Sequence, residues 1–257
     1  MKTLKIKNLS KKYNGILAVN NISFNVSGGE IIGLLGPNGA GKTTTIKMLT
    51  SLLKRSSGRI LFNDKEINRD MNNYKKIIGY VPENANLYNH LSGYEYLMFT
   101  GLLRKIDKNI LGKKIESMSE LFQMGTDIHS SIASCSKGTV QKIVIISAII
   151  HNPEILFFDE PLNGLDINMV LIIKELILKL SQAGKIIIYS SHILEIVEKI
   201  CSRIIIINNG CLIDKKEFED FKGEKNGIDL EIFFKREILS QNEKNIAENI
   251  IRLMISE

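Results

Sequence analysis

The stretch Gly36-Pro37-Asn38-Gly39-Ala40-Gly41-Lys42-Thr43 decides how this chain folds, because it fits G-x-x-x-x-G-K-[ST], the pattern of a loop that wraps nucleotide phosphates. Its glycines let successive backbone N–H groups point at phosphate oxygens. Lys42 can reach the β- and γ-phosphates as a compact positive charge, and the hydroxyl of Thr43 can ligate Mg²⁺. The loop therefore predicts a nucleotide site that also holds a metal ion.

The segments on either side of this loop have the patterns that phosphate binding requires. The apolar run 31–35 predicts a buried strand before the loop. Residues 43–53 predict a helix after it, with Ile46, Leu49 and Leu53 on one face. A helix N-terminus carries a positive dipole end and free N–H groups, so the order strand, loop and helix places both at the phosphates.

The composition limits the class of protein. The chain has 257 residues, 44% hydrophobic and 24% charged, which is enough for one substantial α/β core. It has no apolar run of about 18 to 20 residues and no apolar signal segment at its start, so we expect a soluble, cytoplasmic chain. The three cysteines, at positions 135, 201 and 211, lack metal-like spacing and predict reduced structural thiols. The net charge of +6 comes from dispersed lysines, which predicts a solvated surface and no nucleic-acid partner.

The rest of the chain predicts three kinds of structure. Residues 21–26 alternate polar and apolar side chains, and Leu4, Ile6 and Leu9 form a similar pattern, which predicts antiparallel strands. Strand signals nearly vanish from about residue 86 to 150, where 94–104, 111–124 and 137–150 fit helices. Apolar runs then alternate with helices up to residue 207, which predicts a parallel sheet covered on both faces. The predicted fold class is α/β: a P-loop NTPase core with a mostly parallel sheet, an N-terminal antiparallel β subdomain and an inserted helical subdomain.

Two acidic residues follow the apolar run 155–158. Asp159 and Glu160 would lie at the carboxyl edge of a parallel sheet, where ligands bind. Asp159 can hold Mg²⁺ directly or through water, and Glu160 can orient and polarise an attacking water. The alternative is a merely solvated strand end. His192 follows the strand predicted at 185–189, which places it at the same edge.

Further motifs surround these residues in a fixed order. They are Tyr13, the loop from Gly36 to Thr44, Glu83 after Tyr80-Val81-Pro82, Ser136-Lys137-Gly138-Thr139-Val140-Gln141, Leu162-Asn163-Gly164-Leu165-Asp166, and His192 after Ser190-Ser191. In this order they resemble the motifs of the ATP-binding subunit of ATP-binding cassette (ABC) transporters, over a region from about residue 4 to the mid-220s. The resemblance implies a cassette at 1–225, with the helical insertion at about 86–150, and a short C-terminal extension at 226–257 that ends in a helix near 242–256.

The resemblance also implies a role for each motif. Tyr13 would stack on adenine, and residues 36–44, including Thr44, would hold the phosphates. Lys42, Glu160 and His192 would be the catalytic residues. Thr43, Glu83 and Asp159 would lie around Mg²⁺, with Glu83 coupling the γ-phosphate to the transporter. Ser136 and Gly138 would belong to the signature loop, and residues 162–166 would communicate between sites. The implied cofactors are ATP and Mg²⁺, and the implied assembly is a head-to-tail dimer with two ATP molecules at its interface.

The signature loop has two candidates in this sequence. Leu91-Ser92-Gly93 begins like the family's usual Leu-Ser-Gly-Gly-Gln, but it lies just after Glu83 and begins a predicted helix with a capping box of Ser92 and Glu95. Ser136-Lys137-Gly138 is the better candidate, because Ser136 would cap the helix that leads towards Asp159.

Three departures from the family pattern indicate a branch of the family. Glu83 stands where glutamine is commonest, and Lys137 and Thr139 replace a glycine and a glutamine of the signature. These departures resemble the bacitracin- and lantibiotic-type resistance exporters. The implied partners are a separate transmembrane permease and a second cassette, either this chain or a paralogue, with the protein peripheral on the inner face of the cell membrane.

Other classes of protein fit less well. A GTPase would need an Asn-Lys-x-Asp motif, which the sequence lacks, and a small-molecule kinase would not need the signature loop. A soluble ABC-type ATPase that acts on ribosomes or DNA remains the main alternative. Such proteins generally carry two cassettes, long coiled coils or zinc insertions, whereas this chain has one cassette and no sustained heptads.

Overall fold

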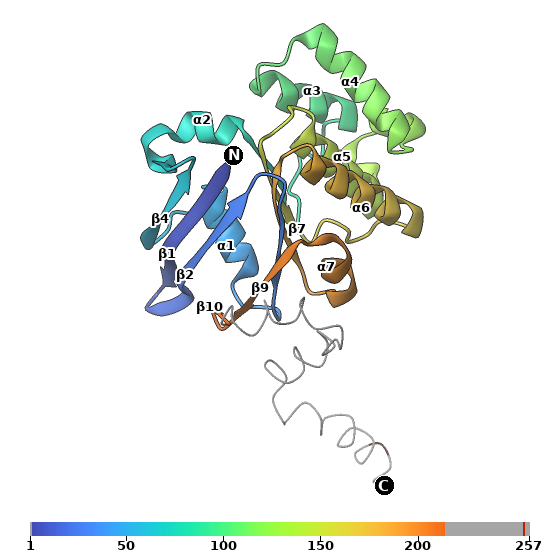
Figure 1. Ribbon diagram of the computed structural model, residues 1–257. Helices are drawn as coiled ribbons and strands as arrows, with labels where there is room; N and C mark the ends of the chain where they lie inside the picture. The colour runs from blue at the N-terminus through green and yellow to red at the C-terminus, as the bar shows by residue number, and fades with distance from the viewer. Residues whose placement is uncertain (1, 214–253, 255–257) are drawn as a thin grey trace.

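Two β-sheets form the framework of the part of the chain that the structure, a computed structural model, describes: residues 2–213 and residue 254 (Figure 1). The smaller sheet is antiparallel and has the strand order β2-β1-β4-β5. Its strands are β1 (Thr3–Tyr13), β2 (Ile16–Ser27), β4 (Ser57–Phe62) and β5 (Lys65–Glu66). The predicted N-terminal antiparallel subdomain is therefore confirmed.

The larger sheet has the order β10-β9-β3-β8-β7-β6. Its strands are β3 (Ile31–Leu35), β6 (Ile78–Val81), β7 (Ile155–Asp159), β8 (Ile186–Ser191), β9 (Arg203–Asn208) and β10 (Cys211–Leu212). All neighbouring strands are parallel except β10, which runs antiparallel to β9 at the edge. This is the mostly parallel sheet that the alternating apolar runs and helices predicted.

Helices cover both faces of the larger sheet and extend beyond it (Figure 1). They are α1 (Lys42–Leu49), α2 (Met71–Lys76), α3 (Gly93–Leu103), α4 (Lys108–Leu121), α5 (Lys137–Ile149), α6 (Ile167–Gln182) and α7 (Leu194–Ile200), with 3₁₀ turns at Ile67–Asp70, Gly125–His129 and Ile132–Ser134. In residues 2–213, none of them has the length and apolar content needed to cross a lipid bilayer.

Strand β7 shows why the larger sheet is buried on both faces. Ile155 and Phe157 pack into a cluster with Ile46 of α1 and the inner face of the antiparallel sheet. Leu156 and Phe158 point the other way and pack against α5 and α6. Because side chains alternate across a strand, a run of apolar residues supplies both clusters at once. Each fully buried side chain of this kind stabilises the fold by about 1.5–3 kcal/mol.

Helix α1 is shorter than the sequence predicted. It ends at Leu49 instead of residue 53, because Ser51 adopts a left-handed φ of 59° that stops the helix. The backbone N–H of Leu53 turns back to donate to the carbonyl of Lys47 at 2.9 Å. Leu53 still packs against the cluster around Ile46, so the apolar pattern was right about burial and wrong about helix length.

The helical segment between β6 and β7 forms the inserted helical subdomain of the fold. Figure 1 shows α3 and α4 at the top of the molecule, away from the antiparallel sheet. Leu97, Leu111, Ile115 and Ile143 are buried where α3, α4 and α5 meet, which ties this segment to the main core. The exact residue limits given above for the insertion stay a prediction. The predicted extension at 226–257, with its helix near 242–256, lies outside the described residues apart from Met254.

Candidate nucleotide site

The predicted site residues meet at one edge of the larger sheet. Strands β3, β8 and β7 are neighbours and parallel, so their carboxyl ends lie side by side. Leu35 pairs with Ser191, and Ser190 pairs with Asp159. The phosphate loop after β3, His192 after β8 and Glu160 after β7 therefore leave the sheet at the same level. The order of strands in the sheet places them together, although they are far apart in the sequence.

The phosphate loop needs glycine at two places where the backbone passes close to other strands. A Cβ at Gly36 would lie 2.1 Å from the carbonyl oxygen of Ile207 on β9. Gly41, the N-cap of α1, has a left-handed φ of 107°, and a Cβ there would lie 2.7 Å from the carbonyl oxygen of Ala18 on β2. Strands of both sheets therefore pass close to the loop backbone, and only glycine fits at these two positions.

Lys42 begins helix α1 and is folded back over the loop. Its side chain is 7% exposed, and its ammonium donates to the carbonyl oxygens of Gly36 at 2.6 Å and Pro37 at 3.1 Å. Burial lowers the pKa of Lys42, and the nearby carboxylates, first Glu160 and then Asp159, act in the opposite direction. A buried cation surrounded by carbonyls and carboxylates is available to a multiply charged anion that enters the loop.

Asp159 ends strand β7 and is completely buried. Its Oδ1 accepts a hydrogen bond from the hydroxyl of Thr43 at 3.2 Å and another from the hydroxyl of Ser190. Its Oδ2 is buried without a hydrogen-bond partner among the described residues. Burial raises the pKa of Asp159, and the two hydroxyls oppose the shift. An unpartnered carboxylate oxygen beside a threonine hydroxyl suits a hard cation with oxygen ligands.

Protein side chains alone would not complete such a cation site. Among residues 2–213 and 254, no group of three or more His, Cys, Asp and Glu side chains could hold a metal ion. Glu83 lies after strand β6 and is exposed, yet its charge acts on both Asp159 and Lys42. Mg²⁺ commonly binds through one or two carboxylates together with phosphate oxygens and water, so this donor set fits Mg²⁺ bound with a nucleotide.

Glu160 takes an unusual backbone conformation next to Asp159. Its φ is 50°, in the left-handed region, although it is not glycine and it precedes Pro161. Its side chain is 7% exposed. Oε1 lies 2.8 Å from Nδ1 of His192, and Oε2 accepts from the hydroxyl of Ser191 at 3.3 Å. A carboxylate is thus held at the site edge, between β7 and β8, in one orientation.

The signature turn lies at the other end of the helical segment. Ser136 caps α5: its hydroxyl oxygen accepts from the N–H of Thr139 at 3.1 Å. A Cβ at Gly138 would lie 2.8 Å from the carbonyl oxygen of Gly164, in the loop after β7. Within the described residues, the contacts seen for this turn are with its own helix and with that loop. The alternative at Leu91-Ser92-Gly93 begins α3, with the capping box predicted between Ser92 and Glu95.

Comparison with known proteins gives the family. A family model described as ABC transporter matches residues 19–163. The linearmycin resistance ATP-binding protein LnrL of Bacillus subtilis is 37% identical over 210 residues, which are 82% of this chain and 68% of LnrL. The chain belongs to the ABC transporter family. It is an ATP-binding subunit of this family, and such subunits hydrolyse ATP, so the chain is an ATPase.

Solved structures agree with this assignment. A structure described as the ATP binding subunit of an ABC transporter has a TM-score of 0.81 and 27% identity, and the match covers 91% of this chain and 98% of the other. The dimeric bacterial ABC transporter cassette MJ0796 has a TM-score of 0.77 over 82% of this chain and 97% of its own. It is 23% identical and shows that the fold is shared.

Tyr13 belongs to the antiparallel sheet, whereas the other site residues end or follow strands of the larger sheet or lie in the helical segment. It ends strand β1 and is 44% exposed. The ammonium of Lys11 lies 4.8 Å from the centre of its ring, a cation–π contact. The described structure therefore leaves the ring accessible, and its predicted role in stacking on adenine stays a prediction.

Sequence reasoning assigned no individual role to Ser190 and Ser191, which lie at the site, or to Gln141, which contacts the loop after Glu160. Ser190 and Ser191 donate hydrogen bonds to Asp159 and Glu160. The pairing of β7 with β8 could have predicted them, because both hydroxyls follow a strand that ends beside the carboxylates. Gln141 of α5 is buried and donates to the carbonyl of Pro161, and it had no sequence signal beyond its place in the signature motif.

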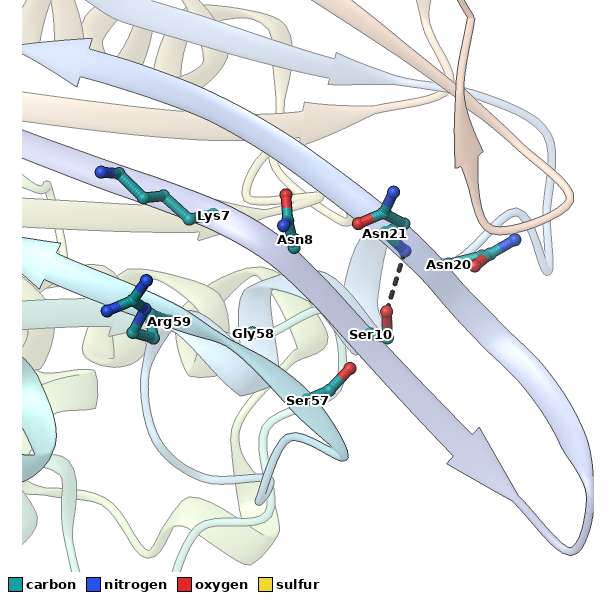
Figure 2. A pocket seen from close by; sticks show the side chains of 8 residues that line it. All are labelled: Lys7, Asn8, Ser10, Asn20, Asn21, Ser57, Gly58 and Arg59. Atoms are coloured by element: carbon teal, nitrogen blue, oxygen red, sulfur yellow. Dashed lines mark hydrogen bonds between the residues drawn. The ribbon is translucent and has the colours of Figure 1, made fainter.

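A polar hollow of about 640 Å³ lies on the outer face of the antiparallel sheet (Figure 2). It is lined by Lys7, Asn8, Ser10, Asn20, Asn21, Ser57, Gly58 and Arg59. Asn8 and Asn21 have left-handed φ angles, and the strand register shifts beside both, so bulges in β1 and β2 shape the hollow. None of the predicted site residues lines it, and the hollow is distinct from the nucleotide site.

Proposed function

We propose that this ATPase binds Mg-ATP at the edge formed by β3, β7 and β8, and uses its hydrolysis to drive a separate membrane protein. The observation that carries the proposal is the meeting of a buried lysine, a buried aspartate with a free oxygen and an oriented glutamate at one sheet edge. The backbone N–H groups of the loop from Gly36 to Thr44, except at Pro37, which has none, and the ammonium of Lys42 bind the phosphates. To do so, Lys42 exchanges its bonds to the carbonyls of Gly36 and Pro37 for bonds to phosphate oxygens.

Thr43 and Asp159 hold the metal ion in this proposal. Their side chains already meet at 3.2 Å, and the free oxygen of Asp159 supports the assignment. Glu83 lies close enough to act on both charges electrostatically, so we place it around the ion or its water. When bound, Mg²⁺ neutralises charge that develops on the phosphate oxygens.

Glu160 and His192 supply the chemistry at the γ-phosphate. The carboxylate of Glu160 orients the attacking water and accepts its proton, which is a step that general bases accelerate by about 10²–10⁴-fold. The hydrogen bond from the imidazole of His192 and the bond from Ser191 keep the carboxylate in one rotamer. Since most of the work in phosphoryl transfer is positioning, the fixed orientation is the contribution of these neighbours.

A second cassette completes each site. The signature turn at Ser136 and Gly138 belongs to the helical segment, and within one subunit its contacts are with its own helix and the loop after β7. Its capped helix N-terminus is suited to a γ-phosphate that another subunit presents. The shared fold with the dimeric cassette MJ0796 supports a head-to-tail dimer in which each ATP lies between the phosphate loop of one subunit and the signature turn of the other.

An exposed apolar strip supports docking to a membrane subunit. Leu52 and Leu103 are 65% and 67% exposed and line one hollow of about 460 Å³. Phe99 lies one turn before Leu103 on α3, and its ring contacts that of Tyr88 at 5.9 Å between centres. Exposed apolar side chains that adjoin one another mark protein interaction surfaces. The name of LnrL and the departures at Glu83, Lys137 and Thr139 favour export of an antibiotic-like compound from the cytoplasmic side.

The variant Glu160→Gln tests this function. It should bind Mg-ATP but hydrolyse it at least about a hundredfold more slowly, because an amide cannot accept the proton. With Mg-ATP it should elute from a size-exclusion column as a dimer, and with ADP as a monomer. The exposed Glu120→Gln on α4 is the matched control and should behave as the wild type. Unchanged hydrolysis would refute the role of Glu160, and a monomer under both conditions would refute the shared site.

A further inference from the structure

The first turns of helix α5 are docked on the loop that follows strand β7. The side-chain amide of Gln141 donates to the carbonyl oxygen of Pro161 at 2.8 Å, and Gln141 is only 6% exposed. One turn earlier, Gly138 lies so close to the carbonyl of Gly164 that a Cβ would be 2.8 Å from it. A Cβ at Gly164 would in turn lie 3.0 Å from Cγ of Lys137. The helix therefore contacts both ends of the segment 161–164.

Among these contacts, the bond of Gln141 is the one next to Glu160. The backbone of Glu160 has the left-handed φ of 50° described above, and the following proline restricts it further. Residues in such conformations are strained and persist only where their surroundings hold them. The N–H of Glu160 donates to the carbonyl of Ser190 at 3.2 Å, which holds the turn on the side of β8. The bond from Gln141 to the carbonyl of Pro161 holds the same turn on the side of α5.

We infer that Gln141 is a positioning residue for ATP hydrolysis: its amide fixes the Glu160–Pro161 turn and thereby the direction of the Glu160 carboxylate. Pro161 has no backbone N–H, so its carbonyl is the polar group through which this turn is tied to α5. The side-chain amide of Gln141 bonds to the backbone of Pro161, next to Glu160, so it acts through Glu160. The inference rests on the role proposed above for Glu160.

The test is a double-mutant cycle on the full chain. Gln141→Met keeps the length of the side chain and removes the donor, leaving the carbonyl of Pro161 buried without it. We expect kcat for Mg-ATP to fall about tenfold, with KM and the Kd for a fluorescent ATP analogue changed less than about twofold. Gln182→Met, at the exposed end of α6, is the matched control and should leave kcat unchanged. Gln141→Glu, which keeps the shape and replaces the donor with an acceptor, should lose activity in the same way.

The cycle is completed in the Glu160→Gln background, with residual hydrolysis followed by single-turnover assays over hours. If Gln141 acts through Glu160, Gln141→Met should change this residual rate less than about twofold. An equal loss in both backgrounds, a loss of nucleotide affinity, or full activity of both Gln141 variants would overturn the inference. Full activity of Glu160→Gln would instead refute the proposed function, and the inference with it. A thermal unfolding midpoint close to that of the wild type would show that each variant is correctly folded.

Discussion

Asp159→Asn should make the ligand-free protein more stable while it destroys the response to Mg²⁺. In the wild type, the buried carboxylate has one oxygen without a partner, and burial raises its pKa. The amide of asparagine is neutral and can still accept from the hydroxyls of Thr43 and Ser190. The NH₂ group of asparagine still lacks a partner at the position of Oδ2, but it carries no charge, so the variant avoids the extra cost of a buried charge, which we take as about 1–3 kcal/mol. Since about 1 kcal/mol moves Tm by about 2–4 °C in a chain of this size, we expect Tm to rise by about 2–12 °C.

The rise in Tm that Mg-ATP causes should be smaller in Asp159→Asn than in the wild type. A ligand at a hundred times its Kd stabilises the folded state by about 2.7 kcal/mol, so Mg-ATP should raise the Tm of the wild type by about 5–11 °C. In the variant, most of the difference between ATP with EDTA and Mg-ATP should disappear, because the carboxylate that holds the metal ion together with Thr43 is gone. Differential scanning fluorimetry under these conditions measures both effects, with the exposed Asp127→Asn as the control. A variant that is less stable without ligand, or that keeps the full Mg²⁺-dependent rise, would refute this account of Asp159.

The difference in stability between ligand-free Asp159→Asn and the wild type should depend on pH, and the pKa shift of Asp159 sets the direction. The folded state holds the proton of Asp159 at a higher pH than the unfolded state, whose pKa is near the ordinary value of 3.8. Between the two pKa values the folded state binds more protons, so the stability of the wild type rises as the pH falls. The advantage of Asp159→Asn should therefore be complete above the folded-state pKa, decrease below it, and vanish below about pH 3.8.

Two further predictions concern the shared site and the core. Lys42→Ala and Ser136→Asp should each be inactive, the first because the phosphates lose their main cation and the second because a carboxylate meets the γ-phosphate. Mixing the two proteins should restore ATP-dependent dimers and some ATPase activity, because one of the two sites in a mixed dimer is intact; no recovery would argue against a signature turn that acts in trans. Ser136→Asp is chosen because aspartate caps a helix as well as serine does, so the start of α5 should be kept. A side chain at Gly138 would instead collide with Gly164 of its own subunit. Phe157→Ala, in the fully buried centre of β7, should lower the free energy of unfolding by about 3–5 kcal/mol in urea titrations; a loss below about 1 kcal/mol, as expected for the half-exposed Phe99→Ala, would contradict the packing described.

The sequence alone predicted most elements, because their signals are local. The apolar runs of β3 and β7 are buried on both faces as expected, and the capping box at Ser92 and the N-cap at Ser136 begin α3 and α5. Short elements escaped prediction. Helix α2 and strands β5 and β10 have two to six residues each, too few for a periodic pattern to stand out. The end of α1 depended on a left-handed serine, which no pattern of apolar residues indicates.

By itself, the sequence determined the phosphate loop, the acidic pair after β7 and the order of the motifs, since each of these consists of neighbouring residues whose chemistry can be read directly. Only the tertiary structure decided which of them meet. The strand order β3-β8-β7 brings the hydroxyls of Ser190 and Ser191 to Asp159 and Glu160, and it leaves one oxygen of Asp159 free. It also docks Gln141 on Pro161 across 20 residues of chain. Such contacts depend on how strands are paired and helices packed, and those choices are fixed by burial of the whole core, which no local stretch of sequence contains.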